Sequence, residues 1–260
     1  MTGTTSCRLA AAALAVVAAL SGCVTTSGFD RKELEKPKEA AQYNLQLGIS
    51  YLRQGRLDLA RDKLERALEQ DPQSAEVHAA AALMYEQARL YERAEGHYRT
   101  AVRLDPGDSA VLNSYGVFLC FRGRHDEAES HFLKAAQNPF YRTPEVAYTN
   151  AGVCARRAPQ PDKAEAYFRQ ALEANPRFVD ALLQMADLSF QQEDFLQARA
   201  FLQRYAESAT HTAEALWLGV RTERAMGDAE AAESYARRLR TEYPESAQTR
   251  LLLESERDAG

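Results

Sequence analysis

The sequence lacks the short motifs on which many enzyme sites are built. Its five histidines form no His-Glu-x-x-His pair, and no Gly-rich phosphate loop, Gly-x-Ser-x-Gly or Cys-x-x-Cys sequence is present. These absences disfavour zinc proteases, nucleotide hydrolases, serine hydrolases and thiol oxidoreductases. We therefore expect a protein that is not an enzyme and that uses no cofactor, no metal ion and no small-molecule substrate.

The chain also lacks a strong excess of charge of either sign. It has 32 basic and 37 acidic side chains among 260 residues, a formal net charge of −5. Such a mildly acidic chain has no electrostatic hold on nucleic acid or on an anionic membrane surface. We expect no nucleic-acid partner.

One apolar run stands out near the N-terminus. Arg8 is followed by twelve residues, Leu9 to Leu20, which are only Leu, Ala and Val. This run is too short to span a bilayer and is typical of a secretory signal. The sequence Leu20-Ser21-Gly22-Cys23 that follows matches the bacterial lipobox, which implies cleavage before Cys23 and lipidation of its thiol. A simple signal peptide or an apolar core helix is the alternative.

The same resemblance to bacterial lipoproteins suggests a destination. In them, an aspartate directly after the lipidated cysteine favours retention in the inner membrane, and here that residue is Val24. We expect lipid anchoring in the outer membrane, facing the periplasm. Residues 1–22 are then the signal peptide, and residues 23–40, which are polar and charged, form a lipidated N-terminus and flexible tether.

A repeated alanine dominates the rest of the chain. It recurs with gaps of 34, 34, 36, 34 and 34 residues, at Ala60, Ala94, Ala128, Ala164, Ala198 and Ala232. This is the tetratricopeptide period, in which each unit is a pair of antiparallel helices and the units stack into a superhelix. The pattern predicts an all-α fold with six helical hairpins over residues 41–246. Chance periodicity in an ordinary helical protein is a poor alternative with six alanines in register.

Other positions repeat with the same period. A large apolar residue follows the first four alanines by four positions, at Leu64, Tyr98, Phe132 and Phe168, and Gly55, Gly123 and Gly227 share one turn. The last two units depart from the pattern, because Tyr205, Thr210 and Ala236 replace a small residue, a proline and a large apolar residue. We expect residues 247–260 to form a C-terminal capping helix and tail that covers unit six with Leu251 and Leu252 or Leu253.

Two cysteines remain after the N-terminal ones are accounted for. Cys7 lies in the predicted signal and Cys23 is the predicted lipid site, which leaves Cys120 and Cys154. The repeat register places both on the first helices of adjacent units, at nearly the same level, so a disulfide is plausible in an exported protein. Two buried free thiols are the alternative.

The first helices of a tetratricopeptide array line its concave surface. Counted from the alanines, an apolar stripe should face this groove and bind a protein, formed by Leu45, Ile49, Leu52, Leu83, Val117, Phe121 and Val153. The Hsp70/Hsp90-binding branch places Lys and Asn at such positions, so a C-terminal carboxylate ligand is not expected here. Burial of some of these side chains between helices is the alternative.

Units three and four carry the most specific motifs. A Tyr-Gly-x-Phe-Leu-Cys sequence ends at Cys120, Asn138-Pro139-Phe140-Tyr141 follows, and Asn150-Ala151-Gly152-Val153-Cys154 comes next. Together with the lipobox, these segments resemble the type IV pilus biogenesis and stability lipoproteins, the PilF/PilW-like pilotins.

The resemblance implies a tetratricopeptide adaptor anchored in the outer membrane. Proteins of that kind bind the pilus secretin, accompany it to the outer membrane and promote its multimerisation, so the secretin is the expected partner. Two other roles stay open, namely regulation of peptidoglycan enzymes and a scaffold role in another outer-membrane assembly machine.

Overall fold

The computed structural model describes residues 31–158 and 160–258, and this part of the chain is entirely α-helical in its regular structure. Thirteen helices follow one another: α1 (Arg31–Arg53), α2 (Leu57–Gln70), α3 (Ala75–Gln87), α4 (Tyr91–Leu104), α5 (Ser109–Phe121), α6 (His125–Ala136), α7 (Pro144–Arg157), α8 (Pro161–Ala174), α9 (Val179–Gln191), α10 (Phe195–Ser208), α11 (Ala213–Ala225), α12 (Ala229–Glu242) and α13 (Ala247–Asp258). The first twelve pair into six hairpins, and α13 packs on α11 and α12 as the predicted cap.

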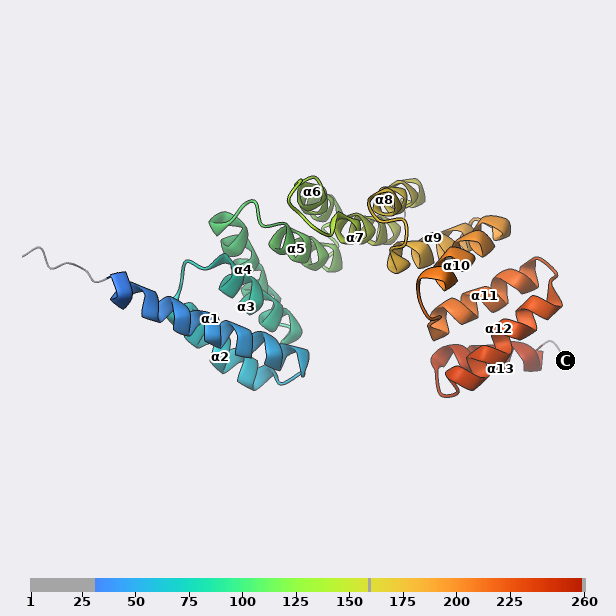
Figure 1. The fold of residues 1–260 in the computed structure, drawn as a ribbon, viewed down its shortest axis with the longest axis horizontal. Helices are drawn as coiled ribbons and strands as arrows, with labels where there is room; N and C mark the ends of the chain where they lie inside the picture. The colour runs from blue at the N-terminus through green and yellow to red at the C-terminus, as the bar shows by residue number, and fades with distance from the viewer. Residues whose placement is uncertain (1–30, 159, 259–260) are drawn as a thin grey trace, which may run out of the picture.

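The hairpins stand side by side in chain order along an arc (Figure 1). Near its middle, α5 and α7 lie on the inner side of the arc, and α6 and α8 lie on the outer side. The all-α tetratricopeptide superhelix expected from the alanine period is confirmed. In units three and four the first helix therefore lies on the concave side, as the groove prediction requires.

The turns inside the hairpins of units one, two, three, five and six share one backbone conformation. Gly55, Gly123 and Gly227 have φ of +70°, +77° and +77°, which glycine adopts without steric cost. Arg89 and Glu193 take the same place in units two and five, with φ of +59° and +62°. The turn is therefore set by the repeat geometry, and two units tolerate a strained non-glycine residue at it.

Each hairpin is held by a small residue of its first helix against a large one of its second. A Cβ added to Gly116 would lie 2.7 Å from Cε1 of Phe132, and one added to Gly48 would lie 2.6 Å from Cγ of Leu64. The repeated alanines are also buried between the helices. The small residue on the first helix thus lets the two helices approach closely, and the bulky side chain of the second helix fills the space that remains between them.

Unit six keeps this arrangement in a shifted register. Ala236, which stands where the large apolar residue was expected, is buried, but the bulky partner is the preceding residue, Tyr235. Its ring lies over Gly219, where an added Cβ would be 2.8 Å from Tyr235 Cδ1. Glycine and tyrosine have both moved by one position, so the 16-residue spacing seen for Gly116 and Phe132 is preserved.

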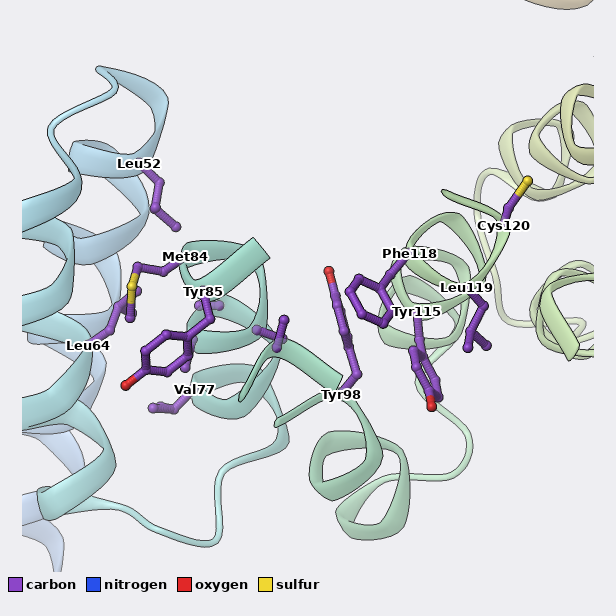
Figure 2. Close-up of a cluster of buried hydrophobic side chains, with 14 of the residues drawn as sticks. Leu52, Leu64, Val77, Met84, Tyr85, Tyr98, Tyr115, Phe118, Leu119 and Cys120 are labelled. Carbon is purple, nitrogen blue, oxygen red and sulfur yellow. The ribbon is translucent and has the colours of Figure 1, made fainter. Parts of the chain in front are cut away.

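A cluster of aromatic rings joins units two and three. Tyr98 lies 5.3 Å, centroid to centroid, from both Tyr115 and Phe118 (Figure 2). Its hydroxyl donates a hydrogen bond to Glu86 Oε2 at 3.0 Å. Burial raises the pKa of both groups, of the Tyr98 phenol and the Glu86 carboxyl. The hydrogen bond supplies a partner for both polar atoms inside an otherwise apolar contact.

The irregular gap of 36 residues has a local cause. Four residues connect the other successive hairpins, whereas seven, residues 137–143, connect α6 to α7. Asn138 anchors this loop, donating hydrogen bonds from Nδ2 to Gly107 O at 3.1 Å and to Ser109 Oγ at 3.0 Å. Phe140 lies at its tip and is 89% exposed.

Unit five makes a polar contact where the repeat pattern has a small residue and a proline. Tyr205 is buried and its hydroxyl donates to Thr210 O at 3.4 Å, so the two departures from the repeat pattern contact each other. The cap α13 inserts Leu252, which is fully buried, whereas Leu251 and Leu253 are exposed. The expected cap is present, with Leu252 as its apolar contact.

Part of the segment expected to be a flexible tether is helical. Helix α1 begins at Arg31 and includes Pro37, so residues 31–40 are helical where a flexible segment was expected. Polar composition pointed to a tether, but a polar segment can extend a helix whose later turns are packed. The predicted signal peptide and the predicted lipid site, Cys23, lie outside the described residues.

The glycine contacts generate a stability prediction. Gly116→Ala should lower the free energy of unfolding by about 1–3 kcal/mol, because the added methyl group overlaps the Phe132 ring. Gly96→Ala is the matched control: nothing lies within 4 Å of its added Cβ, and alanine favours the helix by about 0.5–1 kcal/mol. Urea unfolding of both variants measures the difference, and equal stability for both would contradict the close-packing argument.

Candidate functional site

The predicted stripe contains one truly repeated position on the first helices. Ile49, Leu83, Val117 and Val153 occupy it in units one to four. Leu83 is 40% exposed and Val117 is similarly exposed, whereas Ile49 and Val153 are half-buried against the core. An apolar side chain in each of four consecutive units is therefore accessible from the concave side.

A groove of about 550 Å³ lies between α1, α3 and α5. Of the predicted residues, Leu45, Ile49, Leu52 and Leu83 line it. The remaining lining residues are Gln46, Arg53, Glu76, Ala79, Ala80, Gln87, Asp108, Ala110, Val111 and Ser114. The short side chains of Ala79, Ala80 and Ala110 leave the space that makes the surface concave. The pattern of large apolar residues in the sequence does not predict these alanines.

Two of the predicted residues are not exposed. Leu45 is 1% and Leu52 is 8% exposed, and both belong to the core that joins α1 to its neighbours. They lie one turn to either side of Ile49, on the flank of the helix that α3 covers. Their edges form part of the groove floor, so the sequence identified the correct face but overstated how much of it is free.

Two further predicted residues lie outside this groove. Val117 and Phe121 do not line it, although both are exposed. Phe121 lies at the C-terminal end of α5, where its ring centroid is 5.9 Å from that of Tyr91. It packs at the turn end of the units, away from the floor formed by Leu45 and Ala80. Val153 lies further along, in the cluster of units four to six.

The groove has an apolar floor and charged rims. Glu76 and Asp108 line it at the N-terminal ends of α3 and α5, and Arg53 lines it at the C-terminal end of α1. Asp108 also caps α5, accepting hydrogen bonds from the amides of Ala110 and Val111 at 2.9 and 3.1 Å. This arrangement suits a peptide segment that is apolar on one face and polar at its edges.

The repeated position changes character in the last two units. Asp187 and Arg221 replace the apolar residues there, and their carboxylate and guanidinium are 3.7 Å apart. Arg156 Nη2 donates to Asp187 Oδ2 at 2.6 Å, which links α7 to α9. These three residues line a second cavity of about 340 Å³ together with Trp217. The repeated position on the concave face is therefore apolar in units one to four and charged in units five and six.

The comparisons with known proteins agree with this architecture. Tetratricopeptide repeat models match residues 45–109, 80–142, 155–218 and 214–246. The type IV pilus assembly protein PilF of Pseudomonas aeruginosa is 33% identical over 228 residues, which cover 87% of this chain and 90% of that protein. The chain belongs to the PilF family of tetratricopeptide repeat proteins.

Solved structures of the PilF family have the same fold. A structure of Pseudomonas aeruginosa PilF superposes with a TM-score of 0.72 at 31% identity, covering 85% of this chain and 99% of that one. A structure of PilW, described as a widely conserved type IV pilus biogenesis factor, gives 0.73 at 29% identity, covering 82% and 98%. The similarity includes both the apolar and the charged halves of the chain.

This PilF-family chain joins units three and four covalently. Cys120 of α5 and Cys154 of α7 form a disulfide, with their Cα atoms 5.8 Å apart. The disulfide predicted from the sequence is confirmed, and the alternative of two free thiols at these positions is wrong. The imidazole of His125, the first residue of α6, lies beside it, with Nδ1 3.4 Å from Cys154 Sγ and 4.0 Å from Cys120 Sγ.

The disulfide generates a prediction about stability. Replacing both Cys120 and Cys154 by alanine should lower the free energy of unfolding by about 3–4 kcal/mol, since the bond closes a loop of 34 residues in the unfolded chain. Denaturant unfolding of the double variant beside the oxidised and reduced wild type measures this loss. A double variant as stable as the oxidised protein would show that the cross-link adds nothing.

Proposed function

We propose that this protein is a lipid-anchored adaptor that binds the type IV pilus secretin and promotes its outer-membrane localisation and multimerisation. The observation that carries the proposal is the apolar groove of units one to three in a chain of the PilF family. The name of the Pseudomonas aeruginosa relative, a type IV pilus assembly protein, supplies the context. No reaction is part of this role; binding and anchoring suffice.

The groove matches an amphipathic segment of the secretin in character. Its floor is formed by aliphatic side chains such as Ile49 and Leu83, and its rims carry Arg53, Glu76 and Asp108. Burying each large apolar side chain of a ligand contributes about 1.5–3 kcal/mol. A few such anchors offset the loss of freedom on association, and the charged rims then fix the orientation of the segment.

The anchor is supplied by the N-terminus in this proposal. None of the described helices is long and apolar enough to cross a bilayer. With Cys23 as the lipid site and α1 beginning at Arg31, seven residues separate the two. Seven residues reach at most about 25 Å, so the first unit, which contributes to the groove, would stand close to the membrane.

A single substitution at Leu83 tests the groove proposal. Leu83→Asp places a charge on the floor of the groove and should weaken secretin binding by at least about 30-fold, because an unpaired carboxylate against apolar ligand atoms costs 2 kcal/mol or more. The matched control is Leu196→Asp on α10, where the leucine is 71% exposed and outside both cavities.

Two measurements are made on each variant: the melting temperature of the purified protein and the amount of secretin multimer in cells. The proposal expects normal melting for both variants and loss of multimers only for Leu83→Asp. Normal multimers with Leu83→Asp would place the secretin elsewhere on the molecule.

The anchor proposal has its own test. Cys23→Ser removes the only thiol in the lipobox, so the protein should no longer fractionate with the outer membrane, and secretin multimers there should be depleted. Membrane fractionation with immunodetection gives both readouts. A variant that still sediments with outer membrane would be incompatible with lipid anchoring.

A further inference from the structure

The disulfide that joins units three and four has an unusual third neighbour. Cys120 Sγ, Cys154 Sγ and His125 Nδ1 all lie within 4.8 Å of one another, and both cysteines are buried. They come from three consecutive helices, α5, α7 and the first turn of α6. Two sulfurs and one imidazole nitrogen are a ligand set typical of zinc.

We propose that the reduced form of this cluster is a Zn²⁺ site, in which Cys120, Cys154 and His125 replace the disulfide as the link between units three and four. The oxidised form excludes the metal, because sulfur atoms bonded to each other offer no thiolate. The two links are therefore alternatives set by the redox state of one cysteine pair.

The distances favour this site without movement of the backbone. Zinc binds sulfur at about 2.3 Å and imidazole nitrogen at about 2.0–2.1 Å, so tetrahedral ligand atoms lie roughly 3.5–3.8 Å apart. The distance from His125 Nδ1 to Cys154 Sγ is already 3.4 Å, and that to Cys120 Sγ is 4.0 Å. Two reduced sulfurs must separate to about 3.7 Å in any case, which is the separation that the metal requires. Side-chain rotation supplies it.

Charge and space also fit a cation with an open fourth position. Two thiolates and one neutral imidazole balance the charge of Zn²⁺. Beside Cys154 is a void of about 10 Å³, lined also by Asp126 and Glu129, which is about the volume that one water molecule needs. Water can therefore complete the coordination.

The redox step balances with an ordinary dithiol. The dithiol gives two electrons and two protons to the Cys120–Cys154 bond and becomes a disulfide itself, which leaves two protein thiols. Binding of Zn²⁺ then releases those two protons to solvent, and the His125 Nδ1 lone pair supplies the third bond. A chain that has not yet been oxidised thereby keeps α5 and α7 joined.

The test titrates Co²⁺, a spectroscopic substitute for Zn²⁺, into the full-length mature protein reduced with a trialkylphosphine. The proposal expects one Co²⁺ per chain, with thiolate-to-cobalt charge-transfer absorbance and d–d bands of tetrahedral intensity, and displacement by Zn²⁺. The oxidised protein, treated identically, should give no such bands.

Three variants assign the ligands. Cys120→Ser should abolish the charge-transfer spectrum, and His125→Ala should weaken binding by about 100-fold or more, since loss of mere outer-shell partners already costs 10–100-fold. His131→Ala, also on α6 but packed on the Tyr115 ring, is the control and should bind as the wild type does.

The melting temperature of each oxidised histidine variant verifies its fold. Absence of stoichiometric Co²⁺ binding by the reduced wild type at micromolar metal would overturn the proposal. So would unchanged affinity in a folded His125→Ala variant.

Discussion

Close contact between the two helices of a hairpin is the constraint on which the rest of this structure depends. It requires a residue with no or little side chain on the first helix and a bulky one 16 positions later, as with Gly116 and Phe132. The contact fixes how each hairpin is rotated, and that rotation decides which side chains face the concave surface. When unit six shifts this pair to Gly219 and Tyr235, the hairpin survives because both partners move together.

The fold could be read from the sequence because the packing constraint repeats at single positions. One alanine per unit, with a bulky residue four positions later, was enough to count six hairpins and to place the cysteines opposite each other. The compensated shift at Tyr235 could not be read, because a fixed-register comparison sees only Ala236 where a large residue belongs. A substitution that breaks the repeat can be understood only when the residue that it contacts on the other helix of the hairpin is known.

The sequence predicts the groove less completely than it predicts the fold, and the reason is physical. Helical spacing shows which face of α1 carries Leu45, Ile49 and Leu52, but it does not show how closely α3 approaches that face. The approach depends on Ala79 and Ala80, whose small size both buries Leu45 and hollows out the groove. Extending the register beyond unit four would have revealed Asp187 and Arg221 at the apolar position, and so the charged half of the concave face.

The seven-residue loop between α6 and α7 and the disulfide lie at the same junction. A disulfide spans this connection, since Cys120 precedes the loop and Cys154 follows it. If a protease cut the exposed segment around Phe140, the N-terminal and C-terminal fragments would remain one molecule. The apolar and charged halves of the concave face would then stay in register across a broken main chain. Scission of this exposed loop would thus leave the two parts of the array covalently joined.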